Sequence, residues 1–214
     1  EQGMAIHGFS RERAWQVMEV APDQVILRDE VSSENHPWRY TITMDVLIRE
    51  TGIRIAISLR NDGADAMPFG MGLHPFIPCD ADTIIAFAAK GAFSTDSKGL
   101  PTGPLTASDG LAAGEPALVQ AWRGTDRCYQ DWQNQTAQIH WPKQACTLHL
   151  SADGAFKHLH VFVPTARDVV CVEPVSHFPD VINRPHLGSR ADMTVLERHA
   201  TLHASMNWKV ECIA

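Results

Sequence analysis

The 214-residue sequence has no hydrophobic run long enough to cross a membrane as a helix. Such a helix needs roughly 20 consecutive apolar residues, and no stretch of this chain approaches that length. The first residues also lack the basic region, apolar region and small-residue cleavage site that make up a signal peptide. We therefore expect a cytoplasmic protein that has no membrane partner.

Positive charge is also scarce. Lys and Arg number 18 against 25 Asp and Glu, which gives a formal net charge of −7, and the two signs are interspersed along the chain. A protein that binds nucleic acid typically presents a basic patch to the phosphate backbone. The charge balance therefore predicts that nucleic acid is not a partner.

Closely spaced cysteine pairs are absent. The chain has no CxxC motif, and its five cysteines are an odd number spread widely through it: Cys79, Cys128, Cys146, Cys171 and Cys212. This pattern is typical of a cytosolic protein rather than of a disulfide-rich secreted domain. We expect the thiols to be reduced and mostly buried, where each acts as a small apolar side chain.

Helical periodicity is nearly missing, and strand alternation takes its place. Apolar and polar residues alternate over residues 40–48, 53–59 and 200–210, which is the pattern of half-buried strands. Between the first two runs lies Glu50-Thr51-Gly52, which predicts a hairpin turn with a positive φ available at Gly52. Only residues 11–19 are ambiguous. Shorter strand candidates are residues 25–27, 83–89, 137–141, 146–150, 158–163 and 169–172.

So many one-sided strands must stack as antiparallel sheets or close into a barrel. The length and the ordinary composition, with 44% hydrophobic and 20% charged residues, suit one domain over residues 1–214. Residues 94–122 are rich in Gly, Pro, Ser and Ala, and we interpret them as a long surface excursion. The sequence thus predicts a single all-β domain.

Three stretches combine unusual residue types with bends in the alternation. They are "IHGFSRERAW" with His7, "NDGADAMPFGMGLHPFIP" with His74, and "CVEPVSHFPDVIN" with Glu173. Glu173 ends an apolar strand candidate and is followed at once by Pro174. A carboxylate there is costly unless it is paired or faces a cleft. Taken singly, each residue also fits a purely structural role, as a histidine in the core or as a carboxylate in a surface ion pair.

Taken together, these stretches resemble the aldose 1-epimerases, or galactose mutarotase-like proteins. The resemblance rests on "HGF" and Trp15, on "NDGADAMPFGMGLHPF" at residues 61–76 and on "VVCVEPVSHFPDVIN" at residues 169–183, with a weaker match in "GTDRCYQDW" at residues 124–132. It implies an antiparallel β-sandwich of the galactose mutarotase supersandwich type. It also implies a sugar substrate, whose α and β anomers are interconverted without a cofactor or a metal.

Ring opening needs a base for the anomeric hydroxyl proton and an acid for the ring oxygen, and a carboxylate and an imidazole suit these roles near neutral pH. By the resemblance, Glu173 is the base and His74 the acid. The resemblance also gives substrate contacts: hydrogen bonds from His7, hydroxyl binding by Asp126, and stacking of the sugar on Trp15 and Phe76. Trp15 fits a place in the core equally well.

The chain departs from the family pattern at its start. Members carry an arginine upstream of the His-Gly motif, whereas this chain begins six residues before His7. We therefore expect an N-terminally shortened member in which no residue takes that arginine's role. Loss of the strands that carry it would leave an uncovered sheet edge.

Several alternatives remain open on the sequence. His158-Leu159-His160 places two imidazoles on one strand face, a metal-ligand pattern that we interpret as two structural histidines. A glycoside hydrolase would pair Glu173 with a second carboxylate, Asp126 or Asp180. A non-catalytic sugar-binding protein would need neither His74 nor Glu173. A mutarotase for phosphorylated hexoses would need arginines at the cleft, for which the chain offers Arg39, Arg123 and Arg127.

Overall fold

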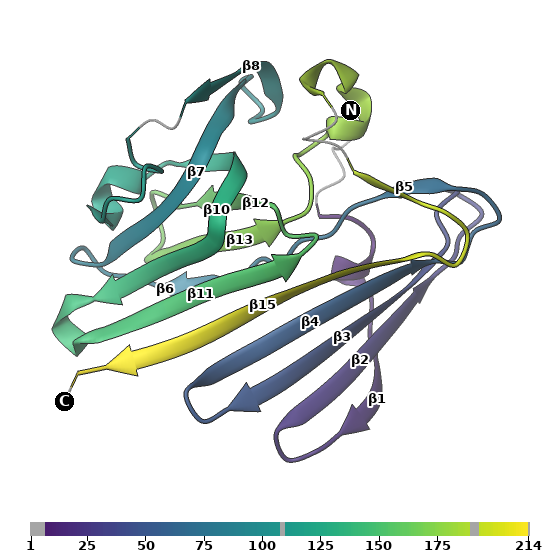
Figure 1. Ribbon diagram of the computed structural model, residues 1–214, viewed down its shortest axis with the longest axis horizontal. Coiled ribbons are helices and arrows are strands. Elements are labelled where there is room, and N and C mark those ends of the chain that lie inside the picture. Colours follow the sequence, from purple (N-terminus) through teal and green to yellow (C-terminus); the bar gives the residue numbers. More distant parts are fainter. Residues whose placement is uncertain (1–6, 108–109, 189–192, 214) are drawn as a thin grey trace.

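The computed structural model describes residues 7–107, 110–188 and 193–213, and antiparallel strands dominate it (Figure 1). Helical structure in the described residues consists of 3₁₀ turns of three or four residues. None of these turns has the length or the apolar character that a membrane-spanning helix requires. The strands are β1 (Gln16–Val20), β2 (Gln24–Val31), β3 (Tyr40–Arg49), β4 (Gly52–Asn61), β5 (Met67–Phe69), β6 (Phe76–Pro78), β7 (Ile84–Thr95), β8 (Pro101–Ala107), β9 (Ala117–Leu118), β10 (Asp126–Trp141), β11 (Cys146–Gly154), β12 (His158–Phe162), β13 (Val169–Val175), β14 (Thr194–Leu196) and β15 (Thr201–Cys212).

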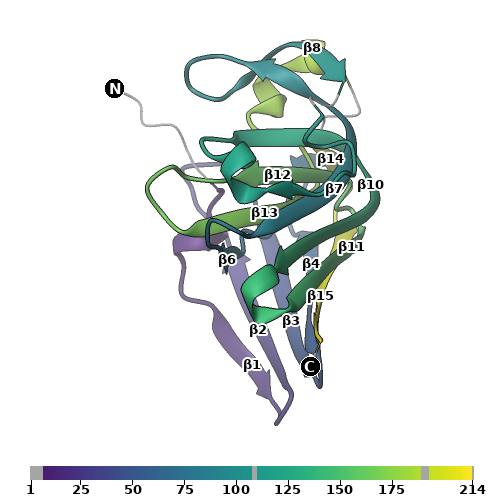
Figure 2. The same cartoon turned by 90° about the vertical axis from the view of Figure 1, so that its left-hand side faces the viewer.

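Most strands belong to one 13-stranded sheet. Ten of them follow the order β1-β2-β3-β4-β15-β11-β10-β12-β13-β6, β7 pairs with β10, β8 and β9 beside this row, and β5 pairs separately with β14. Strand β10 connects the two parts of this sheet, because its first residues pair with β12 and its last residues pair with β11. Between these pairings Asp131, Asn134 and Gln135 have positive φ, and the register with β7 shifts. Figure 2 shows β10 curving from one part toward the other. The predicted all-β antiparallel sandwich class is confirmed.

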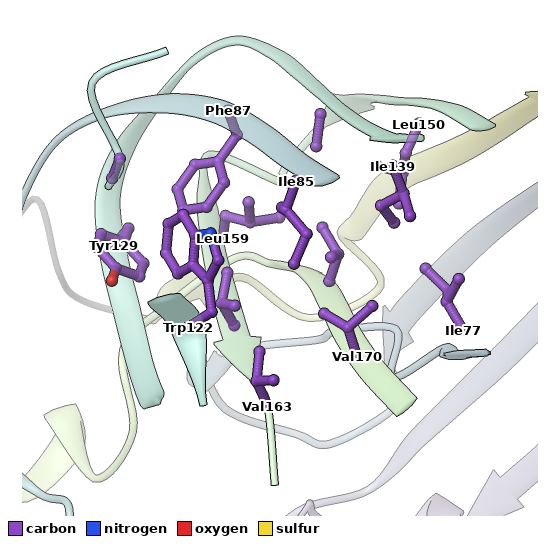
Figure 3. Close-up of a cluster of buried hydrophobic side chains, with 14 of the residues drawn as sticks. Ile77, Ile85, Phe87, Trp122, Tyr129, Ile139, Leu150, Leu159, Val163 and Val170 are labelled. Atoms are coloured by element: carbon purple, nitrogen blue, oxygen red, sulfur yellow. The ribbon is translucent and has the colours of Figure 1, made fainter. Parts of the chain in front are cut away.

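The largest hydrophobic core lies around β7, β10, β12 and β13 (Figure 3). Ile85, Ile139 and Leu159 in this core are fully buried. The interpretation of residues 94–122 as a surface excursion is wrong in part, because Val119 and Trp122 of this segment are also fully buried there. Apolar side chains from a Gly- and Pro-rich segment thus complete a core that the strands alone leave open.

Strands β1 to β4 form the other end of the sheet, beside β15 (Figure 1). Every residue of β1 is exposed, and β1 is the last strand in the order. The predicted hairpin at residues 50–52 joins β3 to β4. Glycine is required at position 52 for a different reason from the one predicted, because Gly52 does not have a positive φ. A Cβ at Gly52 would lie 1.8 Å from the carbonyl oxygen of Trp208, so the close approach of β15 excludes any side chain.

The prediction that all cysteines are reduced is wrong for two of them. Cys146 and Cys212 are directly opposite in the β11–β15 pairing and form a disulfide. They are 66 residues apart in sequence, so no local sequence motif indicates that they form a disulfide. Cys79, Cys128 and Cys171 are free and buried, as predicted.

Candidate active site

Glu173 lies on the central part of β13, where five successive residues are buried. The strand does not stop at Glu173 as predicted, because it continues through Pro174 to Val175 in pairing with β12. The Glu173 side chain is only 7% exposed. Burial raises the pKa of its carboxyl to about 7, the Asp126 charge adds to this rise and His160 opposes it. Glu173 therefore exchanges its proton near neutral pH, as a general base should.

The segment before His74 runs alongside the end of β13. The Leu73 N–H donates to the Pro174 carbonyl at 3.1 Å, and Gly72 forms an isolated β-bridge with Val175. A Cβ at Gly72 would lie 2.9 Å from Val175 Cγ1, so glycine permits this approach. The pairing places His74 beside Glu173, with Nε2 3.3 Å from Oε1. The structure thus brings together the two residues that the sequence assigned as acid and base.

Two aromatic rings enclose His74. Phe76 stacks on it at a centroid distance of 4.7 Å, and the His7 ring meets it edge-on at 5.1 Å. Burial lowers the pKa of His74 below its ordinary 6.5, and the neighbouring His7 lowers it further. Burial, followed by the Arg11 charge, also lowers the pKa of His7. Phe76 remains 54% exposed, so its other face is available to a ligand.

Asp126 begins β10, and its Oδ1 accepts a hydrogen bond from His160 Nε2 at 2.8 Å. This bond is the largest cause that lowers the pKa of Asp126. His160 in turn lies directly opposite Glu173 in the β12–β13 pairing. The sequence interpretation of His160 as structural therefore missed a member of the site. The His-x-His alternation was visible, but the register that faces it toward Glu173 was not.

A cavity of about 580 Å³ opens beside the His74 imidazole. His7, Arg11, His74 and Phe76 line one part of it, and apolar side chains of β2, β3 and β4 line another, together with residues 8–10 and 70–72. Trp15 also lines the cavity, but its indole N–H donates to the Ser10 carbonyl at 2.9 Å. Neither Glu173 nor Asp126 belongs to the lining; Glu173 contacts the lining residue His74, and Asp126 is exposed outside the cavity.

The other residues considered from the sequence lie in structural contacts. His158 is buried, and its Nδ1 accepts the Asp131 N–H at 3.2 Å. Asp180 pairs with Arg184 at 2.9 Å. Arg39 donates to the Ser33 carbonyl, and Arg123 donates to the carbonyls of Pro164 and Arg167 and to Asp168.

Comparisons with known proteins identify the family and the fold that this chain resembles. A family model for aldose 1-epimerase matches residues 1–208. The uncharacterized proteins YphB and YihR of Escherichia coli K12 are each 26% identical to the chain; the matches cover 96% and 90% of the chain, and 71% and 63% of the two relatives. A galactose mutarotase-like protein of Lactobacillus casei has the same fold, with a TM-score of 0.81 at 18% identity over 97% of this chain and 76% of that one.

Proposed function

The chain belongs to the aldose 1-epimerase family, and on that premise we propose that it interconverts the α and β anomers of an aldose. The observation that carries the proposal is the contact between His74 Nε2 and Glu173 Oε1. The anomeric hydroxyl and the ring oxygen of an aldose are bonded to the same carbon. Two adjacent groups, one accepting and one donating a proton, therefore reach both oxygens at once.

In ring opening, Glu173 accepts the proton of the anomeric hydroxyl while His74 donates a proton to the ring oxygen, and the bond from that oxygen to the anomeric carbon breaks. The aldehyde formed then rotates, and the same groups act in reverse to close the ring on its other face. The raised pKa of Glu173 and the lowered pKa of His74 bring the two groups close in proton affinity. One proton shared by the pair is enough for both directions.

The remaining residues supply binding. The exposed face of Phe76 suits the C–H face of a sugar ring, and His7 beside His74 suits a hydrogen bond to a hydroxyl. Asp126 has a 64% exposed side chain, so a free carboxylate lone pair is available to further hydroxyls. Trp15 contributes wall area to the cavity, while its N–H is already bound to the Ser10 carbonyl.

The proposal is tested by polarimetry of freshly dissolved α-D-galactose and α-D-glucose, with protein that has been treated with a chelator. We expect the rotation to decay faster with the protein on at least one sugar. Glu173→Gln should reduce this acceleration by about 10³-fold or more, because the amide keeps the shape but cannot accept the proton. The exposed Glu50→Gln is the matched control and should keep the full rate.

Two results would contradict the proposal. Near-normal acceleration by Glu173→Gln would exclude this carboxylate as the base. Sugar binding measured by calorimetry without any acceleration by the unaltered chain would instead identify a non-catalytic sugar-binding protein.

Arg11 favours a second candidate, a phosphorylated hexose. It lines the cavity beside His7 and His74, whereas Arg39 and Arg123 are held by backbone carbonyls. A guanidinium there would bind a phosphate by charge-assisted hydrogen bonds. If the substrate is phosphorylated, kcat/KM for glucose 6-phosphate should exceed that for glucose, and Arg11→Ala should remove the difference. Equal values for the two sugars would reject this candidate.

A further inference from the structure

Three side chains with different ligand atoms meet at the centre of the site. Cys171 precedes Glu173 by two residues on β13, so both side chains lie on the same face of the strand. The Cys171 side chain is fully buried. One ligand atom each from His74, Cys171 and Glu173 lies within 4.8 Å of the other two. The proposed acid–base chemistry uses the first and the third of these residues but has no role for the thiol.

The spacing of these atoms suits a tetrahedral metal ion. Zinc binds imidazole nitrogen and carboxylate oxygen at about 2.0–2.2 Å, which in tetrahedral geometry separates the two ligand atoms by roughly 3.4 Å. The observed separation of His74 Nε2 and Glu173 Oε1 is 3.3 Å. The two ligands are therefore already at the spacing that coordination requires.

A second observation points to a ligand at this position. The Glu173 side chain is more than nine-tenths buried. Its Oε1 nevertheless has no hydrogen-bond partner among the residues that the structure describes. Buried polar atoms are nearly always satisfied, and an exception indicates a position for an ordered water, an ion or a reacting group. The orphaned oxygen faces the imidazole and lies on the same strand face as the thiol.

We propose that His74, Cys171 and Glu173 bind a thiophilic divalent cation, with Zn²⁺ as the best match to one nitrogen, one sulfur and one oxygen ligand. The Cys171 thiol loses its proton to solvent when the Zn–S bond forms. A fourth position stays open for water. Because the cation occupies the lone pairs that the sugar reaction needs, cation and sugar exclude each other. The inhibitory part of this inference rests on the proposed function, while the binding part does not.

Binding is tested on the full chain after removal of metal by a chelator. Zn²⁺ is titrated by calorimetry, and Co²⁺ by absorption, since a bound thiolate gives a sulfur-to-cobalt charge-transfer band. We expect one Zn²⁺ per chain at this site and a charge-transfer band with Co²⁺. Cys171→Ser should remove the band and weaken Zn²⁺ binding by about 100-fold or more, since loss even of a residue that only supports a ligand costs 10–100-fold.

Cys128→Ser is the matched control, because Cys128 is also free and buried but lies outside the cluster. This variant should keep both the band and the affinity. Absence of the band in the unaltered chain would overturn the inference without any variant, and a band that persists in Cys171→Ser would overturn the ligand assignment. If Cys171→Ser does not fold, Glu173→Gln provides the same test, with at least a tenfold loss of Zn²⁺ affinity expected.

Inhibition is tested by polarimetry, with each protein's rate in Zn²⁺ divided by its own rate in chelator. This ratio should fall at least tenfold for the unaltered chain and for Cys128→Ser, and should change little for Cys171→Ser. Added sugar should raise the apparent Kd of Zn²⁺. A cobalt band without inhibition would reject mutual exclusion. A cobalt band in a chain that accelerates no anomerisation would instead contradict the proposed function and leave the metal site standing.

Discussion

The two ends of the large sheet differ in how far their side chains are removed from water. On β12 and β13, Leu159, Val161 and Val170 are fully buried. On β1, Val17 and Val20 are 61% and 73% exposed. We call these regions the buried end (β7, β10, β12 and β13) and the open end (β1 to β4 with the segment that precedes β1). The candidate site takes residues from both, with Glu173 from β13 and His7 from the segment that precedes β1.

This difference in burial assigns two roles within the site, one that sets the proton affinity of the base and one that contacts the substrate. A carboxyl whose pKa is raised to about 7 by burial requires tight packing around it, and β13 in the buried end provides this packing. Groups that contact a substrate need access instead, and His7 is exposed. The buried end thus sets the proton affinity of Glu173, while the exposed His7 leaves the site accessible to a ligand.

The largest contrast between the two ends is expected in stability. Leu159→Ala removes a fully buried side chain from the main core and should lower the free energy of unfolding by about 2–5 kcal/mol. Ile48→Thr keeps the β-branch at a position that is 57% exposed on β3 and should change it by less than about 0.5 kcal/mol. Urea denaturation of both variants measures the difference. Equal losses would show that the open end is packed as tightly as the buried end.

The disulfide should have the next largest effect, because it fixes β15, the strand between the two ends. Replacing both Cys146 and Cys212 by Ser releases a cross-link over 66 residues, and should lower the free energy of unfolding by about 2–4 kcal/mol. Urea denaturation of the double variant, with and without reducing agent, is the measurement. The unaltered chain should fall to the variant's stability on reduction, and a variant as stable as the oxidised chain would contradict the prediction.

Within the site, the contrast appears as a difference between two histidines. His74→Asn should lower kcat for anomerisation by about 10²-fold, the ordinary contribution of a positioned acid. His7→Asn should lower kcat by less than about tenfold and act mainly on KM, because an exposed residue beside the acid contributes binding rather than proton transfer. Initial rates by polarimetry over a range of sugar concentrations separate the two parameters. A change in KM alone for His74→Asn would make it a binding residue.

The sequence predicted what depends on short stretches of chain and missed what depends on register. The alternation over residues 40–48 and 53–59 identified β3 and β4, and the glycines and proline around His74 marked a bend. The Cys146–Cys212 pair and the place of His160 opposite Glu173 were missed, because each follows from strands that meet only after the sheet has formed. The buried part of residues 94–122 was missed because its Gly and Pro content hid the apolar side chains that fill the core.

The smallest expected effect is a displacement of the pH profile of kcat/KM. The size of this displacement should differ between variants of the buried end and variants of the open end. The reaction needs unprotonated Glu173, whose fraction grows as the pH rises toward about 7, and protonated His74, whose fraction falls from below pH 6.5 upward. The product of these two fractions is a bell with its maximum between the two pKa values, and each limb falls about tenfold per pH unit.

The bell-shaped pH profile has the same form whether Glu173 or His74 holds the shared proton. Variants at the buried end and at the open end are therefore needed to identify which limb of the profile reports the titration of Glu173. His160→Asn removes the electrostatic interaction with His160 that lowers the pKa of Glu173, and should move that limb to higher pH. His7 is not among the groups that shift the Glu173 pKa, so His7→Asn should leave this limb in place while it lowers the rate. If His7→Asn displaces the Glu173 limb as far as His160→Asn does, the open end also sets the proton affinity of the base, and the division of work between the two ends is wrong.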